Sequence, residues 1–175
     1  MLDTRYAPVN VYLSAGSNIA PEVNLQQACQ ELESAYGDLV LSSVYQNSAV
    51  GFAGDDFLNM VIGFSTHHHP ERIIDHLERL HDKAGRVRGD DPFSSRTLDL
   101  DLLLYGDLVW ERLKVPREDI EKYGFVLRPL AEVAPDLRHP VTGATIGQIW
   151  DDFDQAASPM TRVDVGIEQT ELAYG

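Results

Sequence analysis

Cysteine is almost absent from this sequence: the 175 residues contain one, Cys29, so no disulfide can form within a chain. Long apolar runs and a signal peptide are also lacking, and we therefore expect a cytoplasmic protein that makes no membrane contact. Basic residues are scarce, because 14 Lys and Arg stand against 28 Asp and Glu, which gives a formal net charge of -14. A field of that sign repels nucleic acid and anionic membranes, so we expect neither as a partner.

The hydrophobic share of 43% is ordinary for a globular protein with a packed core, and the length predicts one domain. We place that domain at residues 1–150. Residues 151–175 are acidic and weakly patterned, so we treat them as a C-terminal extension, part of which we expect to be disordered. We also expect a monomer. The few basic residues do cluster, since Arg86, Arg88 and Arg96 lie within eleven residues of one another.

Hydrophobic periodicity predicts the order strand, helix, strand, strand, helix, strand. Strands are expected at 10–13, 39–45, 57–64 and 96–105. Helices are expected to begin at Pro21 and Pro70, because proline suits the first turn of a helix, and Gly85 supplies a stop after the second. This order favours an α+β fold with a ferredoxin-like βαββαβ core, in which helices pack on a mainly antiparallel sheet. A further short helix at 125–134 makes the expected arrangement three-layered, α-β-α.

One strand carries the strongest chemical signal, the run Arg-Thr-Leu-Asp-Leu-Asp-Leu-Leu-Leu-Tyr at 96–105. The opposite face from its leucines carries Asp99 and Asp101, whose backbones lie about 7 Å apart at strand rise. Two like charges repel there unless a cation sits between them, and Mg2+ uses one or two carboxylates together with substrate phosphates. With Arg96 just upstream, the run is typical of a metal-and-phosphate platform; the simpler alternative is an amphipathic strand with a solvated polar face. Its alternation places four leucines on the core face: Leu98, Leu100, Leu102 and Leu104.

The strand expected at 57–64 alternates in the same way, with Phe57 and Asn59 on the face opposite its core residues. Because two helices cover one face of the expected sheet, the other face is left for a ligand. That face would bring Phe57 and Asn59 together with the two aspartates. Residues 86–95 lack periodicity and contain Gly, Asp and Pro, so we expect a mobile loop there.

With these residues in place, the sequence resembles the 6-hydroxymethyl-7,8-dihydropterin pyrophosphokinase family of folate biosynthesis. The family transfers pyrophosphate from ATP to the pterin hydroxymethyl group and releases AMP, so the resemblance implies ATP and hydroxymethyldihydropterin as substrates. The arginine followed by two aspartates is specific in this setting, whereas Gly-Ser-Asn alone is weak. The matching segments follow the family's order over about residues 9–150: Gly16-Ser17-Asn18, Phe57-Leu58-Asn59, Gly85-Arg86-Val87-Arg88, Arg96-Thr97-Leu98-Asp99-Leu100-Asp101, Val115-Pro116 and Gly124-Phe125-Val126-Leu127.

The resemblance implies a role for each matching side chain. Asp99 and Asp101 hold two Mg2+ ions around the ATP phosphates, and Asp99 also contacts the pterin. Asn59 hydrogen-bonds the edge of the pterin ring, for which its amide offers both a donor and an acceptor. Phe57 and Phe125 stack on the two faces of the ring.

The resemblance also implies roles for arginines. Arg86 and Arg96 contact the ATP phosphates and stabilise the charge that develops during transfer, at the two ends of a lid that closes over ATP. Arg117 stands where the family has a histidine that contacts the nucleotide, and we expect it to bind ATP. Arg117 and Arg128 would then replace part of the positive charge that is lost at residues 92–95, where the lid departs from the family as described next.

The sequence departs from the family on the ATP side. Residues 92–95 read Pro-Phe-Ser-Ser where the family usually has Arg-Trp-Gly-Pro. An acidic residue late in the second helix becomes His81, and an arginine before Gly-Phe becomes Tyr123. These departures favour, as an alternative function, a pterin-binding paralog with weak or no transferase activity. A third interpretation is an unrelated antiparallel sheet protein.

Three further features leave alternatives open. His81 is equally consistent with a packed helix residue and with an active-site group. The run at 67–69, three histidines, is more simply a solvated loop than a metal site. Cys29 repeats with leucines at helical spacing and is more simply a core residue than a reactive thiol.

Overall fold

The computed structural model describes residues 7–48, 54–85 and 97–167, and its sheet has the strand order β5-β1-β4-β3-β6, with β2 also paired to β4. Every pairing in it is antiparallel. This arrangement confirms the predicted α+β class. The helices and strands are β1 (Val9–Ser17), α1 (Pro21–Tyr36), β2 (Val40–Leu41), β3 (Val44–Asn47), β4 (Phe57–Thr66), α2 (Pro70–Lys83), β5 (Asp99–Tyr105), α3 (Asp119–Lys122), α4 (Gly124–Val133), α5 (Ile146–Asp152) and β6 (Thr161–Val163), with 3-10 turns at Glu111–Leu113 and Gln155–Ala157.

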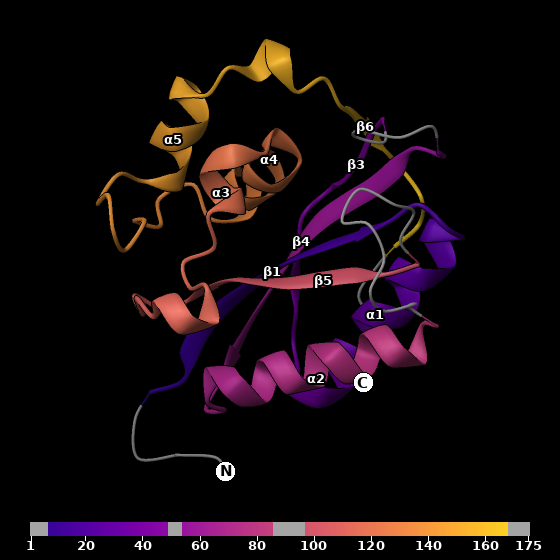
Figure 1. Cartoon of the computed structure of the whole chain (residues 1–175), viewed down its shortest axis with the longest axis horizontal. Helices are drawn as coiled ribbons and strands as arrows, with labels where there is room; N and C mark the ends of the chain where they lie inside the picture. The colour runs from indigo at the N-terminus through magenta and orange to yellow at the C-terminus, as the bar shows by residue number, and fades with distance from the viewer. Residues whose placement is uncertain (1–6, 49–53, 86–96, 168–175) are drawn as a thin grey trace, which may run out of the picture.

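The sheet lies between two layers of helices (Figure 1). Helices α1 and α2 pack against one face, and α3, α4 and α5 lie on the other. The larger core fills the α1–α2 side, where Leu13, Met60 and Leu100 from three strands meet the buried faces of both helices. The predicted three-layer arrangement is therefore present. Among the described residues, no helix is long and apolar enough to cross a membrane.

Cys29 lies on the buried face of α1 and is 3% exposed. Burial, together with the nearby Glu33 carboxylate, raises the pKa of the Cys29 thiol to about 12. The thiolate is the reactive form of cysteine, and it is suppressed at neutral pH. The core interpretation of Cys29 is thus confirmed.

Two predicted strands differ in detail from the structure. The strand expected at 39–45 is two short strands, because the hydroxyl of Ser42 accepts the Val61 N–H at 2.8 Å and interrupts the backbone ladder. Leu104 was expected on the same face as Leu102, and this is wrong. Leu102 pairs with Leu13 and Leu104 with Tyr12, so Leu103 is an extra residue that forms a bulge. The bulge turns Leu104 toward the α3–α4 core.

The segment after residue 150 differs from the separate extension that we expected. Helix α5 continues to Asp152, and β6 adds an edge strand by pairing Val163 with Val44. Three strand residues are too few to show a periodic pattern, so β6 could not be predicted from periodicity. Residues 168–175 lie outside the described part of the chain.

An aromatic and histidine cluster joins α1 to α2. The Tyr36 ring stacks on Phe64 with centroids 4.2 Å apart, and the Tyr36 hydroxyl lies 2.8 Å from His76 Nδ1. Burial, and then the Arg79 guanidinium, lower the pKa of His76. Burial, and then Arg72, lower the pKa of His68.

These lowered pKa values predict a loss of stability in mild acid. Below the usual histidine pKa of 6.5 the unfolded chain binds a proton that folded His76 resists, so the free energy of unfolding falls as the pH falls through this range. We expect His76→Gln to lose less stability than wild type between pH 7.5 and pH 5.5, as measured by urea unfolding. Parallel stability curves for the two proteins would contradict this assignment.

Candidate active site

The register of the sheet brings a row of polar side chains to one face. Asn59 on β4 pairs with Gly16 on β1, and Gly16 pairs with Asp99 on β5. Directly opposed residues in antiparallel strands project from the same face, so Asn59 and Asp99 flank Gly16. In the next row, Ser14 lies between Val61 and Asp101. This face is opposite the α1–α2 core.

Gly16 keeps the row open at its centre. A Cβ added to Gly16 would lie 2.7 Å from Asn59 Oδ1. The Asn59 amide therefore lies over the backbone of β1, where only glycine leaves room. Asn59 is 8% exposed, and its Nδ2 donates a hydrogen bond to Asn47 Oδ1. Asn47, the last residue of β3, is a site neighbour that the sequence analysis did not single out.

A single methyl group should therefore disturb the Asn59 amide. If the ligand is the hydroxymethyldihydropterin that the family resemblance implies, we expect Gly16→Ala to weaken its binding by about two- to tenfold, since one hydrogen bond is worth about 0.5–1.5 kcal/mol. Calorimetric titration with the pterin would measure the change.

Gly63→Ala is the matched control for this substitution. A Cβ added to Gly63 would lie 2.9 Å from Tyr12 Cε1. Gly63 is on β4, the strand of Asn59, and faces the same side of the sheet, but its crowded neighbour is Tyr12 and not Asn59. Equal loss of pterin affinity in both variants would show that general distortion of the paired strands β1 and β4, and not displacement of Asn59, is responsible.

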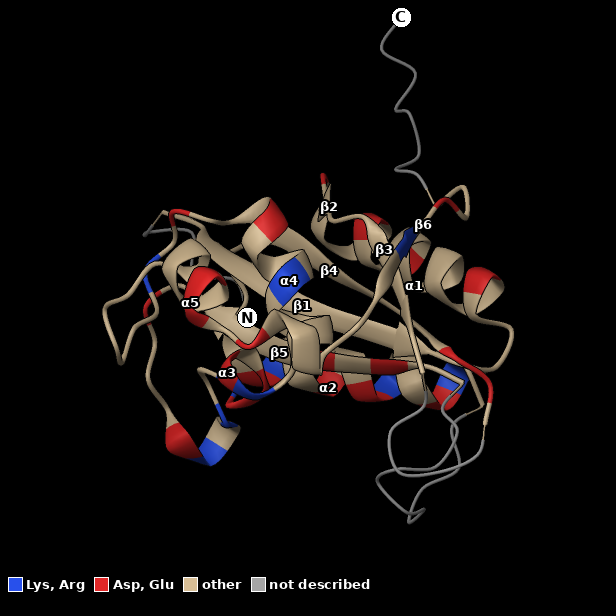
Figure 2. Cartoon of the chain, turned by 90° about the horizontal axis from the view of Figure 1, so that it is seen from above, with Lys and Arg blue, Asp and Glu red and all other residues tan. Residues whose placement is uncertain are grey.

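The guanidinium of Arg117, a residue outside the sheet, lies near the two carboxylates of β5. Arg117 Nη2 lies 3.6 Å from Asp101 Oδ1, and Arg117 Nε lies 3.2 Å from Asp119 Oδ2. The Arg117 N–H donates to the Leu103 carbonyl at 3.0 Å, which fixes the residue beside the bulge. Acidic positions thus lie on both β5 and α3 (Figure 2).

The electrostatics of Arg117 follow from this setting. Burial alone would lower the pKa of Arg117, but the charges of Asp101 and Asp119, with Asp99 adding to them, outweigh burial and raise it. Arg117 therefore stays protonated and neutralises part of the negative charge on this face. It is about three-quarters buried, at 26% exposure, and so it is held in place rather than solvated.

The donor set fits a hard divalent cation that is shared with phosphates. Asp99 and Asp101 are both partly exposed and supply only carboxylate oxygen. No group of three or more His, Cys, Asp or Glu able to hold a metal occurs in the described residues. Mg2+ binds through one or two carboxylates when substrate phosphates complete its shell, which is what two carboxylates on one strand face allow.

Aromatic rings border the same face. Phe57 begins β4 two residues before Asn59, so its side chain projects in the same direction. Phe125 lies in the first turn of α4, and its ring stacks on Tyr123 with centroids 5.0 Å apart and planes 18° apart. Tyr123 thereby fixes the Phe125 ring. Sequence reasoning noted Tyr123 only as a departure, although the aromatic-Gly-aromatic spacing could have indicated the pair.

Some of the predicted residues do not belong to this face or are not described. Arg86 and Arg96, with the loop expected to be mobile, lie outside the described residues. His81 is buried in the last turn of α2 at 2% exposure, which supports the packed alternative for this residue. Of the histidine run, the described contacts of His68 are hydrogen bonds through its backbone and an edge contact with Tyr36.

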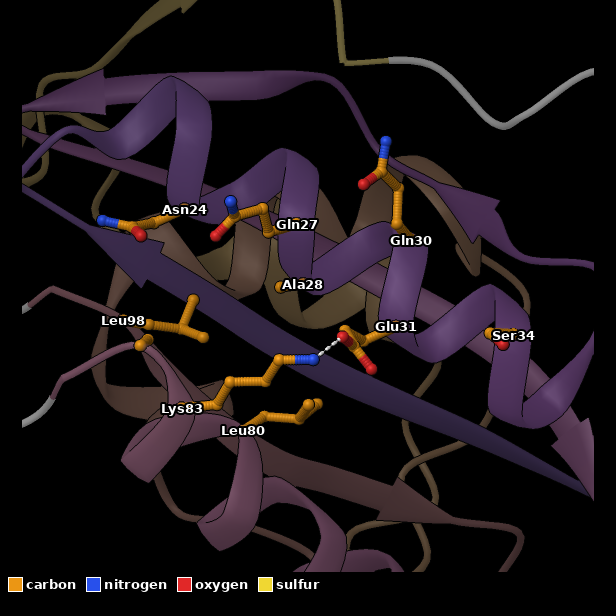
Figure 3. Close-up of a pocket in the computed structure, with 10 residues that line it drawn as sticks. Asn24, Gln27, Ala28, Gln30, Glu31, Ser34, Leu80, Lys83 and Leu98 are labelled. Carbon is orange, nitrogen blue, oxygen red and sulfur yellow. Dashed lines mark hydrogen bonds and ion pairs between the residues drawn. The ribbon is translucent and has the colours of Figure 1, made fainter.

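A cavity of about 520 Å3 lies elsewhere, between α1 and α2 (Figure 3). Leu80 and Leu98 border it, and both belong to the core on the α1–α2 side of the sheet. Lys83 reaches across from α2 to form an ion pair with Glu31 on α1. The cavity is thus on the opposite side of the sheet from the carboxylates of β5.

Comparison with known proteins identifies the class. A family profile described as 7,8-dihydro-6-hydroxymethylpterin-pyrophosphokinase (HPPK) matches residues 12–135. A 2-amino-4-hydroxy-6-hydroxymethyldihydropteridine pyrophosphokinase from Synechocystis is 38% identical over 147 residues, covering 81% of this chain and 75% of that protein. The protein of the same name from Pseudomonas aeruginosa is 38% identical over 136 residues, covering 74% of this chain and 83% of that one.

The fold agrees with a solved structure. Wild-type HPPK-DHPS from Plasmodium falciparum superposes with a TM-score of 0.67 at 10% identity, over 85% of this chain and 45% of that chain. Our chain thus corresponds to less than half of that protein, and the likeness concerns the fold alone. Fold and relatives together define the class: the protein is an enzyme of the pyrophosphokinase type. Within that class, the chain belongs to the 7,8-dihydro-6-hydroxymethylpterin-pyrophosphokinase family.

Proposed function

We propose that this protein transfers pyrophosphate from ATP to 6-hydroxymethyl-7,8-dihydropterin, with Mg2+, to give the pterin diphosphate and AMP. The observation that carries the proposal is the row Asn59–Gly16–Asp99. In this row only a glycine separates the Asn59 amide, which can hydrogen-bond the edge of a pterin ring, from the Asp99 carboxylate. A pterin held at Asn59 would present its hydroxymethyl group toward the carboxylates. Relatives named for pterin pyrophosphokinase activity support this substrate.

Each part of the site has a role in binding the pterin. The Asn59 amide offers a donor and an acceptor to the ring edge. Phe57 and Phe125 offer aromatic faces, each worth about 0.5–1.5 kcal/mol beyond burial when it stacks on a flat ring. Tyr123 stacks on Phe125 and holds that ring in place.

The reaction joins the hydroxymethyl oxygen to the β-phosphorus of ATP. The bond from that phosphorus to the oxygen shared with the α-phosphate breaks, AMP leaves with that oxygen, and the hydroxyl proton is released. Two Mg2+ ions, held by Asp99 and Asp101, would neutralise the phosphate oxygens when bound. Transfer of this kind depends mainly on positioning and electrostatics, so a strong general base is not required.

Arginines would supply the remaining positive charge. We assign Arg86 and Arg96 to the phosphates as catalytic groups, because a guanidinium fits phosphate through two parallel hydrogen bonds. Arg117 already lies beside Asp101 and would contact the nucleotide from there. Its guanidinium pairs with the carboxylates of Asp101 and Asp119.

A second candidate function is a pterin-binding paralog with weak transferase activity. The observation that favours it is Tyr123, whose ring packs on Phe125 and provides no charge for ATP. Under this alternative the pterin binds normally, while ATP turnover is slow.

One assay separates the two functions. Purified protein is mixed with hydroxymethyldihydropterin, ATP and Mg2+, and AMP release is followed together with pterin binding by calorimetry. AMP release that needs both pterin and Mg2+ supports the pyrophosphokinase. Pterin binding with no AMP release supports the paralog, and the absence of pterin binding would reject both.

A further inference from the structure

A buried histidine joins α2 to the strand that carries both aspartates. His81 lies in the last turn of α2 and is 2% exposed. The backbone N–H of Leu100 donates a hydrogen bond to His81 Nε2 at 2.8 Å. Leu100 is the residue between Asp99 and Asp101, so the imidazole binds the peptide group in the middle of the acidic pair.

The hydrogen bond defines the state of the imidazole. An N–H group can only donate, so Nε2 accepts, and the neutral ring then carries its proton on Nδ1. His81 Nδ1 lies 3.1 Å from Glu78 Oε1, one turn earlier on the same helix. The Glu78 carboxylate therefore favours the tautomer in which Nε2 accepts the hydrogen bond from the Leu100 N–H.

The position of β5 in the sheet makes this contact consequential. Within the described part of the chain, β5 lies at the edge of the sheet, with β1 as its neighbour. Opposed residues in an antiparallel ladder alternate between pairs that exchange two backbone hydrogen bonds and pairs that exchange none. The Leu100 N–H donates to His81 and not to β1, so Leu100 belongs to a pair that exchanges none. The flanking residues, Asp99 and Asp101, are then the ones that exchange backbone hydrogen bonds with Gly16 and Ser14. The acidic segment is thus held by β1 on one side and by His81 on the other.

We propose that His81 is a positioning residue for the metal site. By fixing the Leu100 peptide against α2, it holds the two carboxylates at one separation and orientation. A neutral imidazole does so without adding a charge beside two carboxylates. This inference rests on the proposed function, because it assigns to His81 the geometry of the proposed Mg2+ ligands.

The test replaces the acceptor and leaves the helix intact. In His81→Gln the amide oxygen is as many bonds from Cα as Nε2 and can still accept from Leu100, whereas in His81→Asn it is one bond too short. Lys83→Ala is the matched control. Lys83 lies in the same turn of α2 as His81, but its ion pair is with Glu31 on α1 and not with β5 (Figure 3).

Metal affinity is measured with Mn2+, which shares the oxygen preference of Mg2+, by electron paramagnetic resonance in the presence of a non-hydrolysable ATP analogue. Removing partners that orient metal ligands commonly costs about 10- to 100-fold in affinity. We expect a loss in that range for His81→Asn, and affinities near wild type for His81→Gln and Lys83→Ala. In His81→Asn, pterin affinity should change less than Mn2+ affinity, because Asn59 lies two strands away on β4 and only the Asp99 contact links the pterin to β5.

The outcomes distinguish the two levels of the argument. If the wild type binds no Mn2+ with the analogue, the proposed function fails. If the wild type binds Mn2+ and His81→Asn binds it equally well, or His81→Gln loses as much as His81→Asn, the positioning role is wrong. Should His81→Asn fail to fold, hydrogen exchange at the Leu100 amide decides. Exchange in the wild type as fast as in an unfolded chain overturns the inference, and strong protection in both wild type and His81→Gln supports it.

Discussion

Asp99→Asn and Asp101→Asn should each lower pyrophosphoryl transfer on the order of 10³-fold while the fold stays intact. Each change removes a carboxylate that would hold Mg2+ against the phosphates, and metal stabilisation of this charge is worth several kcal/mol, at 1.36 kcal/mol per tenfold in rate. Stability should hardly fall, because the change relieves repulsion between two carboxylates on one strand face. The ion pair with Arg117 that Asp101 loses is partly exposed and contributes little.

AMP release at saturating ATP, pterin and Mg2+ measures this effect, and thermal unfolding checks the fold. Asp119→Asn is the matched control, since it also removes a carboxylate that pairs with Arg117 but lies on α3 rather than on β5. We expect it to retain most of the activity. Wild-type turnover in the Asp99 or Asp101 variant would eliminate the metal site from the proposed mechanism.

The second large effect is expected at Arg96, for which we predict a loss of about 10²- to 10³-fold in the chemical step on substitution by alanine. Although Arg96 itself lies outside the described residues, the carbonyl of the next residue, Thr97, accepts a hydrogen bond from Ser17 Oγ at 2.5 Å. Ser17 is fully buried at the end of β1. The chain is therefore anchored at Thr97, directly after Arg96, and we expect this anchor to help aim the Arg96 guanidinium at the charge that develops on the phosphates.

Single-turnover kinetics separate the chemical step from binding for this variant. Pterin affinity should remain at the wild-type value, because Asn59 and the aromatic rings are unchanged. Arg112→Ala serves as the control, since Arg112 is an exposed arginine that pairs with Glu71 at 3.9 Å, away from the carboxylates of β5. If Arg96→Ala keeps the wild-type chemical step and loses only pterin affinity, Arg96 is a binding group and its catalytic role is wrong.

Local pattern was sufficient for much of the fold. Alternation with a period of two placed Leu100 in the core and the two aspartates on the other face of the strand. Helical spacing placed Cys29 on the buried face of α1. These predictions succeeded because the periodicities of strands and helices are properties of a few consecutive residues. The failure at Leu104 has the same origin, since one extra residue in a bulge shifts the alternation without any local signal.

The sequence by itself determined the α+β order, the resemblance to a pterin pyrophosphokinase family, and the face of each strand that carries polar residues. Only the tertiary structure decided what those residues meet. Strand register, which no local pattern encodes, set Gly16 between Asn59 and Asp99. Packing of distant segments brought Arg117 to Asp101, β6 to β3, and His81 to the Leu100 peptide. These contacts join residues far apart in the chain, and they exist only once the helices are packed on the sheet.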